Sequence, residues 1–262
     1  MKIARFAAEG AVYYGIIEGD QVAVITGLPW EGRERTGESF ALAAVQLLAP
    51  VEPPDVFAIG LNYKSHAAES DMALPTAPVV FLKAASSVIG PNEPVVLPAM
   101  APEEVDYEAE LALVIGKSCR KVSEADALDY VLGYTCGNDI SARDCQIKLD
   151  KQWARGKSFA TFCPLGPWIE TELDPTAVEI SLTLNGEEMQ HSSTQHLIFS
   201  CRFLVSYLSQ ITELRPGTVI MTGTPEGVGF ARQPQVFLRP GDKLEVNVAG
   251  IGTLANPVIA DS

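Results

Sequence analysis

The sequence predicts an α+β protein that is rich in β structure: a twisted barrel or sandwich of short strands, a few short helices and a small N-terminal β lobe. Short β-prone runs recur along the 262 residues, and Gly, Pro, Asn and Asp separate most of them. Stretches with helical periodicity are few. Hydrophobic residues form 47% of the chain and charged residues 20%, which is typical of a globular protein and argues against disorder.

The N-terminal lobe is expected to span residues 1–52. It begins with a β-meander whose strands are separated by Glu9-Gly10 and Gly19-Asp20, and Phe40–Leu48 is predicted to be a short helix. A proline-rich segment then gives a boundary, so residues 53–262 are predicted to form a second, larger domain. The predicted strands of the lobe are residues 2–6, 11–18 and 21–25.

The larger part of the chain is expected to alternate short strands with turns. Two helices are predicted, over Ser123–Val131 and over Thr194–Ser209, and the apolar stripe of the second is interpreted as core packing. The predicted strands are residues 56–59, 79–82, 87–89, 95–97, 107–115, 131–136, 168–170, 179–184, 219–222 and 243–248.

Charge and cysteine content exclude several classes of function. The formal net charge of −14 argues against nucleic acid and anionic membranes as partners, because binding to phosphates requires clustered Lys and Arg. No apolar run approaches the length of a membrane span, and a cytoplasmic location is expected. The five cysteines lack C-x-x-C spacing and are predicted to be reduced, mostly buried thiols.

The clearest chemical feature is the segment Asp106-Tyr107-Glu108-Ala109-Glu110, which leads directly into an apolar strand. The period-two geometry of a strand predicts that Asp106, Glu108 and Glu110 share one face. Carboxylates that lie side by side on one strand face repel one another unless a cation neutralises them. A hard divalent cation prefers oxygen ligands. The spacing leaves two interpretations open, a site for Mg²⁺ or Mn²⁺ and a solvated face of an edge strand.

Two further groups of residues carry possible chemistry. Asp139 follows an apolar run and could complete a three-carboxylate site, or it could serve only in a helix cap or an Asx turn. His66 and Glu69 are three residues apart and would meet on one helical face, either as a general base with its orienting carboxylate or as a surface ion pair. No role is assigned to His191 or His196.

Taken together, the segments resemble the fumarylacetoacetate hydrolase family, in its bacterial branch of diketo-acid hydrolases and 2-hydroxyhepta-2,4-diene-1,7-dioate isomerases. The resemblance covers about residues 55–258. It is carried, in family order, by Gly60-Leu61-Asn62-Tyr63 with His66 and Glu69, Phe81-Leu82-Lys83, Asp106 to Leu111, Gly137 to Asp144, Lys157-Ser158-Phe159, Cys163 to Pro167, and Thr222 to Gly229.

The resemblance implies a mixed β-sandwich roll, usually a homodimer, that binds Mg²⁺ or Mn²⁺ through Glu108, Glu110 and Asp139. It further implies that the helix carrying His66 and Glu69 is a lid. The other implied roles are Lys157 beside the enolate, Arg143 and Gln146 as substrate contacts, and Thr224 as a donor to a substrate carboxylate.

The expected function is metal-dependent hydrolysis of the C–C bond of a small 2,4-diketo acid through a pyruvate enolate. An oxaloacetate decarboxylase, or a tautomerase or isomerase, could use the same metal and enolate, and a catalytically silent metal-binding protein is a further alternative. Substrate specificity is expected to depend on loops at residues 71–78 and 190–194.

Overall fold

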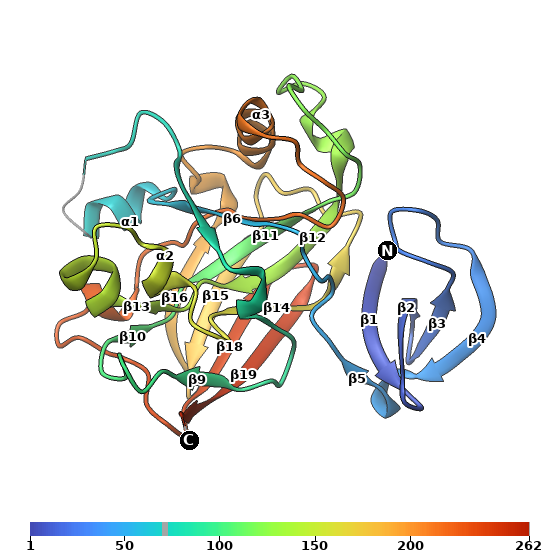
Figure 1. Cartoon of the computed structure of the whole chain (residues 1–262), viewed down its shortest axis with the longest axis horizontal. Helices are drawn as coiled ribbons and strands as arrows, with labels where there is room; N and C mark the ends of the chain where they lie inside the picture. The colour runs from blue at the N-terminus through green and yellow to red at the C-terminus, as the bar shows by residue number, and fades with distance from the viewer. Residues whose placement is uncertain (70–72, 262) are drawn as a thin grey trace.

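The computed structural model describes residues 1–69 and 73–261, and a large mixed β-sheet forms its centre (Figure 1). The sheet's twelve strands, in chain order, are β1 (Lys2–Ala8), β2 (Ala11–Glu18), β3 (Gln21–Ile25), β4 (Arg35–Ala41), β5 (Gln46–Leu47), β6 (Val56–Gly60), β7 (Val79–Lys83), β8 (Val88–Ile89), β11 (Ala109–Ile115), β12 (Val131–Asn138), β14 (Cys163–Glu170) and β17 (Val219–Met221). Their order in space is β4-β3-β2-β1-β14-β12-β11-β17-β6-β7, with β5 beside β1 and β8 beside β14.

A second sheet packs against this one. Its strands are β9 (Val95–Leu97), β15 (Glu179–Leu184), β16 (Glu187–Ser193), β18 (Lys243–Val248) and β19 (Gly252–Ala260), in the order β16-β15-β18-β19-β9. A two-stranded ribbon pairs β10 (Val105–Asp106) with β13 (Ser141–Ala142). Most pairs are antiparallel, but β6 runs parallel to β17, β8 to β14 and β9 to β19. The predicted β-rich α+β class and the mixed sandwich are confirmed.

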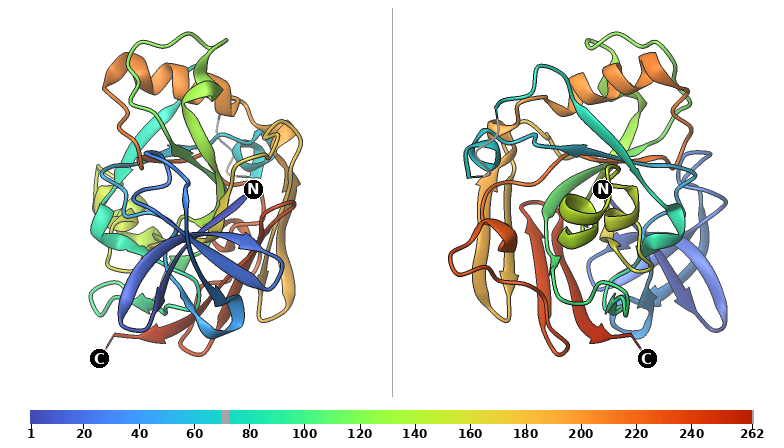
Figure 2. Two further views of the ribbon diagram at one scale, coloured as in Figure 1. Left: turned by 90° about the vertical axis from the view of Figure 1, so that its right-hand side faces the viewer. Right: turned by 60° about the vertical axis from the view of Figure 1, so that its left-hand side comes forward.

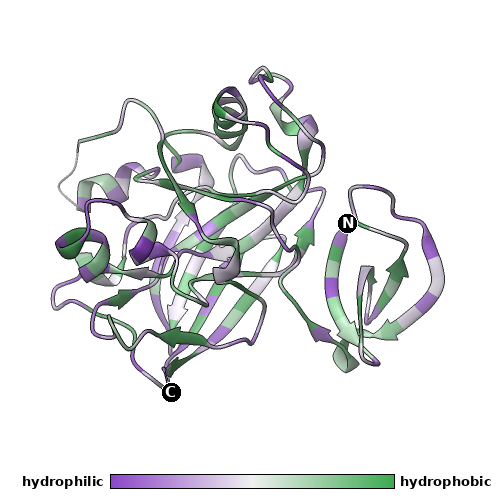
Figure 3. Cartoon of the chain, in the orientation of Figure 1, coloured by the Kyte–Doolittle hydropathy of each residue, from purple (hydrophilic) through white to green (hydrophobic). Residues whose placement is uncertain are grey.

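The central strand β11 is buried along its whole length. Leu111 and Leu113 face the second sheet, in a core with residues such as Leu182 and Val246. Ala112 and Val114 face the opposite side of the large sheet, where they join a separate core. The apolar run after Glu110 is continuous because β11 has protein on both of its faces, and Figure 3 shows hydrophobic residues running through the strands of both sheets.

The N-terminal strands continue the large sheet, since β1 pairs with β14 through Lys2–Glu170 and Ile3–Ile169. Figures 1 and 2 show the resulting lobe at one end of the molecule. The division into residues 1–52 and 53–262 stays a prediction, as does the homodimer. The predicted helix Phe40–Leu48 is wrong: Phe40 and Ala41 pair with β3, the 3₁₀ turn Leu42–Ala44 follows, and Gln46 and Leu47 form β5.

The helices are short and lie around the sheets. The predicted helix Thr194–Ser209 is interrupted, because the amide of Ile198 bonds to the carbonyl of Asn62 and the Ser200 side chain caps a helix that begins at Cys201. Ser123–Val131 contains only one 3₁₀ turn. The helical elements are α1 (Lys64–Glu69), α2 (Ala154–Lys157), α3 (Cys201–Ile211), a π-helical segment (Asp144–Leu149) and the 3₁₀ turns Leu42–Ala44, Ala85–Ser87, Ala127–Tyr130, Thr194–His196 and Gly229–Ala231.

All five cysteines are buried and free, as predicted. Within residues 1–69 and 73–261, no helix combines the length and the apolar character that crossing a membrane requires.

Candidate metal centre

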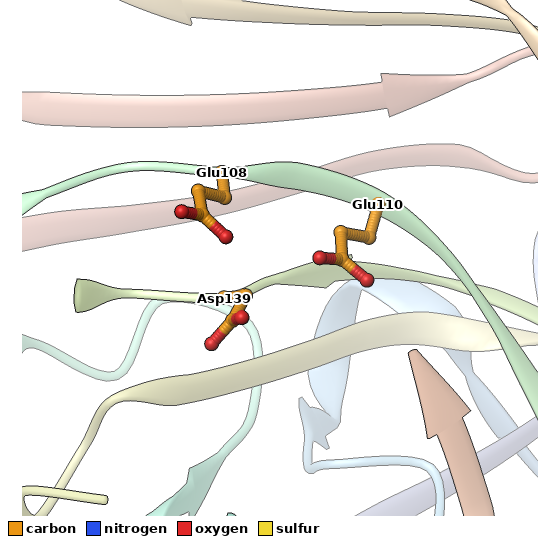
Figure 4. A group of neighbouring side chains, drawn as sticks. All are labelled: Glu108, Glu110 and Asp139. Atoms are coloured by element: carbon orange, nitrogen blue, oxygen red, sulfur yellow. The ribbon is translucent and has the colours of Figure 1, made fainter. Parts of the chain in front are cut away.

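Three carboxylates meet where β11 begins and β12 ends. The pairing of these strands places Ala109 opposite Asn138, and the amide of Asp139 donates to the carbonyl of Glu108 at 2.9 Å. This register brings Asp139 beside Glu108 and Glu110, and one ligand oxygen from each of the three lies within 4.8 Å of the others. Figure 4 shows the three carboxyl groups turned toward a shared space.

The three carboxyl groups are all buried, but their neighbouring charges differ, and so do the pKa values of the two glutamates. Burial raises the pKa of Glu110 well above its usual value, and the neighbouring Asp139 and Glu108 raise it further. Burial alone would also raise the pKa of Glu108, but Lys157 and Arg143 outweigh it and lower this pKa to about 2. Glu110 is therefore the member of the cluster whose negative charge is least compensated by the protein.

Two lysines neutralise Asp139. The ammonium group of Lys157, on α2, lies 2.7 Å from Asp139 Oδ2 and 2.8 Å from Glu108 Oε2, and Lys83 on β7 pairs with Asp139 Oδ1. Burial would lower the pKa of Lys157, but Asp139 and Glu108 raise it overall. Lys157 therefore stays charged at the edge of the cluster.

The donor set fits a divalent cation. The three carboxylates supply only oxygen ligands, which hard cations prefer, and they are almost fully buried at 5%, 1% and 0% exposure. Solvent would screen the charges of a surface cluster, whereas the buried charge that Lys83, Lys157 and Arg143 leave uncompensated, chiefly that of Glu110, needs a counter-charge inside the protein. The alternative of a solvated edge-strand face is therefore wrong.

Asp106 does not share the strand face of the other two acids. It ends the ribbon strand β10, and Tyr107 and Glu108 lie outside any strand before β11 begins, so the period-two alternation is broken. Its fully buried carboxylate accepts hydrogen bonds from the amides of Gly229 (2.8 Å) and Phe230 (3.0 Å) and pairs with the guanidinium of Arg143 at 2.8 Å.

The helix α1 carries the predicted pair. His66 Nδ1 lies 2.6 Å from Glu69 Oε1, and Glu69 Oε2 accepts a hydrogen bond from the amide of Gly227 at 2.9 Å. Ser65 also donates to Glu226. The helix is thus attached to the loop that follows β17, and it turns His66 toward the neighbouring cavity.

A cavity of about 470 Å³ adjoins the carboxylates. Of the predicted catalytic and substrate-binding residues, His66, Lys157, Arg143, Gln146 and Thr224 line it, whereas Glu69 contacts it only through His66. Arg143 Nη1 reaches both Glu108 Oε1, at 2.7 Å, and Gln146 Oε1, at 2.9 Å. The apolar part of the wall is formed by Ile59, Leu61, Phe81, Ile147, Trp153, Val228 and Phe230.

The backbone also shapes the site at Gly223. Its amide donates to Glu110 Oε2 at 2.7 Å, and its φ of +98° is in the region that favours glycine. A Cβ here would lie 2.7 Å from the Cβ of Asn62, whose amide group bonds Phe199 and Thr222. Because glycine has no Cβ, the backbone at Gly223 can pack closely against Asn62, and in this position its amide donates to Glu110.

Several residues in and around the site were missed by the sequence interpretation. Asp106 was predicted on the wrong face, and Lys83 and Asn62 received no individual role. Gln190 was placed in a specificity loop, but it is a buried residue of β16, so that prediction is wrong for residues 190–193. In the other proposed loop, residues 73–78 lie outside helices and strands, whereas 71 and 72 fall outside the described residues. No spacing signal marks Gln190, because its partners are distant in sequence.

Both parts of the chain match known protein families. Residues 55–259 match the family model for the fumarylacetoacetate (FAA) hydrolase C-terminal region, and residues 1–50 match a model named Rv2993c-like, N-terminal. The chain is 44% identical over 220 residues to a mitochondrial oxaloacetate tautomerase of Xenopus laevis, an alignment that covers 82% of this chain and 69% of that protein.

Two solved structures are similar over the whole chain. The 5-carboxymethyl-2-hydroxymuconate delta-isomerase from Mycobacterium smegmatis is 45% identical, with a TM-score of 0.91 and complete coverage of both chains. The 2-hydroxyhepta-2,4-diene-1,7-dioate isomerase from Mycobacterium marinum is 41% identical, with a TM-score of 0.91 and coverage of 100% of this chain and 99% of that chain. The chain therefore belongs to the fumarylacetoacetate hydrolase family.

Proposed function

We propose that this protein is a divalent-metal-dependent enzyme that interconverts the enol and keto forms of a small 2-oxo acid. One observation carries the proposal: three buried carboxylates within 4.8 Å of one another adjoin a cavity into which a histidine, a lysine and an arginine project. The relatives named as an oxaloacetate tautomerase and as two isomerases support proton transfer as the net reaction.

Glu108, Glu110 and Asp139 would hold the cation, and their oxygen-only set favours Mg²⁺ or Mn²⁺. A bound cation would supply Lewis-acid stabilisation of the negative charge on the enolate oxygen. Lys157 adds a fixed positive charge beside the same carboxylates. Arg143, Gln146 and Thr224 offer donors to the substrate carboxylate, so the substrate would lie with its charged end toward these residues.

His66 is the proposed acid–base residue. Its Nδ1 is held by Glu69, so Nε2 is left to exchange a proton with the substrate carbon in the cavity. Because Glu69 is itself fixed by the amide of Gly227, the imidazole has a defined orientation.

Hydrolysis of a 2,4-diketo acid is the second candidate, because the same histidine could instead take a proton from water that attacks a distal carbonyl. The cavity volume of about 470 Å³ and its apolar wall leave room for a substrate longer than oxaloacetate. Oxaloacetate decarboxylation would need the enolate but no attacking water. A catalytically silent metal-binding protein is disfavoured, because His66, Lys157 and Glu108 all line one cavity.

The reactions can be separated by direct assay. The enol form of oxaloacetate, acetylpyruvate and 2-hydroxyhepta-2,4-diene-1,7-dioate should be supplied with Mg²⁺, with Mn²⁺ and with EDTA. We expect metal-dependent loss of enol absorbance without release of CO₂ or of pyruvate and acetate. Cleavage of acetylpyruvate would favour the hydrolase instead, and turnover that is unaffected by EDTA would contradict the metal-dependent mechanism.

Replacing His66 by Gln is expected to reduce kcat by about 10²–10⁴-fold, which is the usual contribution of a positioned acid–base group. Metal affinity should not change, since His66 is not among the three carboxylate ligands. Steady-state kinetics and calorimetric titration with Mn²⁺ measure the two quantities. His196→Gln, at a histidine outside this cavity, serves as the matched control, and equal activity of H66Q and H196Q would exclude the proposed role.

A further inference from the structure

We propose that Gln190 is a positioning residue that fixes the hydroxyl group of Thr224 as a hydrogen-bond donor toward the substrate. The inference rests on the proposed function, from which Thr224 takes its role. Gln190 lies on β16, in the second sheet, and its side chain is 1% exposed. It does not line the cavity and therefore would act only through its neighbours.

The side-chain amide of Gln190 makes three hydrogen bonds of similar length. Its Oε1 accepts from the amide of Ala109 at 2.8 Å. Its Nε2 donates to the carbonyl of Pro225 at 2.9 Å and to Thr224 Oγ1 at 2.8 Å. One side chain thus connects the residue between Glu108 and Glu110 to the loop that carries Thr224.

The two backbone partners decide which end of the amide is which. The Ala109 N–H can only donate, and the Pro225 carbonyl can only accept. If the amide were flipped, it would place N–H against N–H and C=O against C=O, so the orientation is fixed by chemistry. The group that faces Thr224 is therefore an NH₂ group, and the hydroxyl oxygen has to accept from it.

This has a consequence for the hydroxyl hydrogen. A threonine hydroxyl has one hydrogen to donate, and the bond from Gln190 uses an oxygen lone pair and leaves that hydrogen free. Across residues 1–69 and 73–261, no protein acceptor for this hydrogen is found. Thr224 lines the cavity, so the hydrogen is available to an anionic oxygen there. A donor that is oriented before the substrate arrives costs no reorganisation during binding or reaction.

The same contacts also fix the distance between the carboxylate cluster and the Thr224 hydroxyl group. Ala109 is held between the two glutamates of the cluster, and Pro225 follows Thr224 directly, so Gln190 sets the spacing between the carboxylate cluster and the hydroxyl donor. A substrate that contacts both would be sensitive to this spacing, because displacements of about 1 Å in a site can have large effects on rate.

The test uses oxalate, a dianionic mimic of the pyruvate enolate, as the probe for the Mn²⁺-loaded protein. Thr224→Val removes the donor, Gln190→Glu replaces the NH₂ by an acceptor that would attract the Thr224 hydrogen, and Gln190→Met removes both groups at similar volume. Each single variant is expected to bind oxalate about tenfold or more weakly, the usual effect of losing a hydrogen bond to a charged group. Gln195→Glu, at an exposed glutamine, is the matched control and should bind normally.

The decisive measurement is non-additivity. In the Thr224→Val background, Gln190→Met and Gln190→Glu should weaken oxalate binding by less than about twofold, while Mn²⁺ affinity stays close to that of Thr224→Val. A merely structural role would give the full loss in both backgrounds and overturn the inference. Normal oxalate binding by the Gln190 variants, or by Thr224→Val, would also overturn it but leave the proposed reaction standing. Failure of the unmodified protein to bind Mn²⁺ would instead reject the proposed function.

Discussion

Replacing Glu110 by Gln is expected to remove metal-dependent activity and at the same time to stabilise the metal-free protein. The loss of a ligand should cost several kcal/mol of transition-state stabilisation, or about 10²–10⁴-fold in kcat. Stability should rise because Glu110 is a buried acid surrounded by Asp139 and Glu108, and a neutral amide of the same shape avoids that repulsion. The amide oxygen of Gln can still accept from Gly223, so the local fold should be kept.

The pH dependence of this effect has a defined sign. Because folding raises the pKa of Glu110, the folded protein holds this proton more tightly than the unfolded chain does. The resulting contribution to stability is complete below the unfolded pKa of about 4.5 and is lost as pH rises toward the raised folded pKa. In EDTA, the thermal midpoint of the unmodified protein should therefore fall relative to that of Glu110→Gln as pH increases above about 4.5.

The measurement is a series of thermal melts with EDTA and with Mn²⁺. For a domain of this size, each kcal/mol corresponds to about 2–4 °C in Tm. Mn²⁺ should raise the Tm of the unmodified protein and have much less effect on Glu110→Gln. Glu245→Gln, at a glutamate paired with Lys243 on the surface, should behave like the unmodified protein. A metal-free Glu110→Gln protein with a lower Tm at neutral pH would contradict the electrostatic argument.

Replacing Asp106 by Asn should have the opposite effect on stability, although Asp106 is only four residues from Glu110. Its buried carboxylate is paired with Arg143 and accepts from the amides of Gly229 and Phe230. Removing one partner of a buried ion pair costs about 3–5 kcal/mol, and Arg143 would keep only Glu108 as an ion-pair partner. Activity should fall as well, since Arg143 and Phe230 both line the cavity.

Urea unfolding and thermal melts would measure this loss. Asp242→Asn is a suitable control, because Asp242 also accepts from a backbone amide, that of Arg239, but lies on the surface. We expect that control to change stability by less than about 1 kcal/mol. Equal stability of the two variants would show that Asp106 and Arg143 do not form the strong buried pair that their geometry indicates.

The sequence predicted the fold class and most strands, because a strand buried on one or both faces leaves a clear pattern of apolar residues. The segment from Leu111 to Ile115 is the best example. The helix predictions were weaker. Phe40 is apolar enough for a helix but pairs with Val22 in the lobe, where its ring contacts Phe6 and Tyr13. Those tertiary contacts override local propensity and cannot be read from the local sequence.

The two-residue spacing of Glu108 and Glu110 left a metal site and a solvated face both open, and the family resemblance, carried in part by the motif that contains Asp139, implied the metal site. The same alternation suggested that Asp106 shared their face, and the break in the strand at Tyr107 and Glu108 made this wrong. Gln190 and Lys83 were missed for a different reason. Each acts through partners more than 30 residues away, and only the folded arrangement of the sheets brings them together.

The pairing of β1 with β14 also determines what the lobe does for the rest of the molecule. Without β1, the outer side of β14 near Ile169 would be a free sheet edge, and Leu165 and Ile169 would lose the apolar cover of Ile3 and Ile16. Unprotected edges of this kind recruit strands from other molecules. Deleting residues 1–52 would therefore expose β14 as an unpaired edge strand. The truncated protein should aggregate even where the carboxylate cluster stays intact.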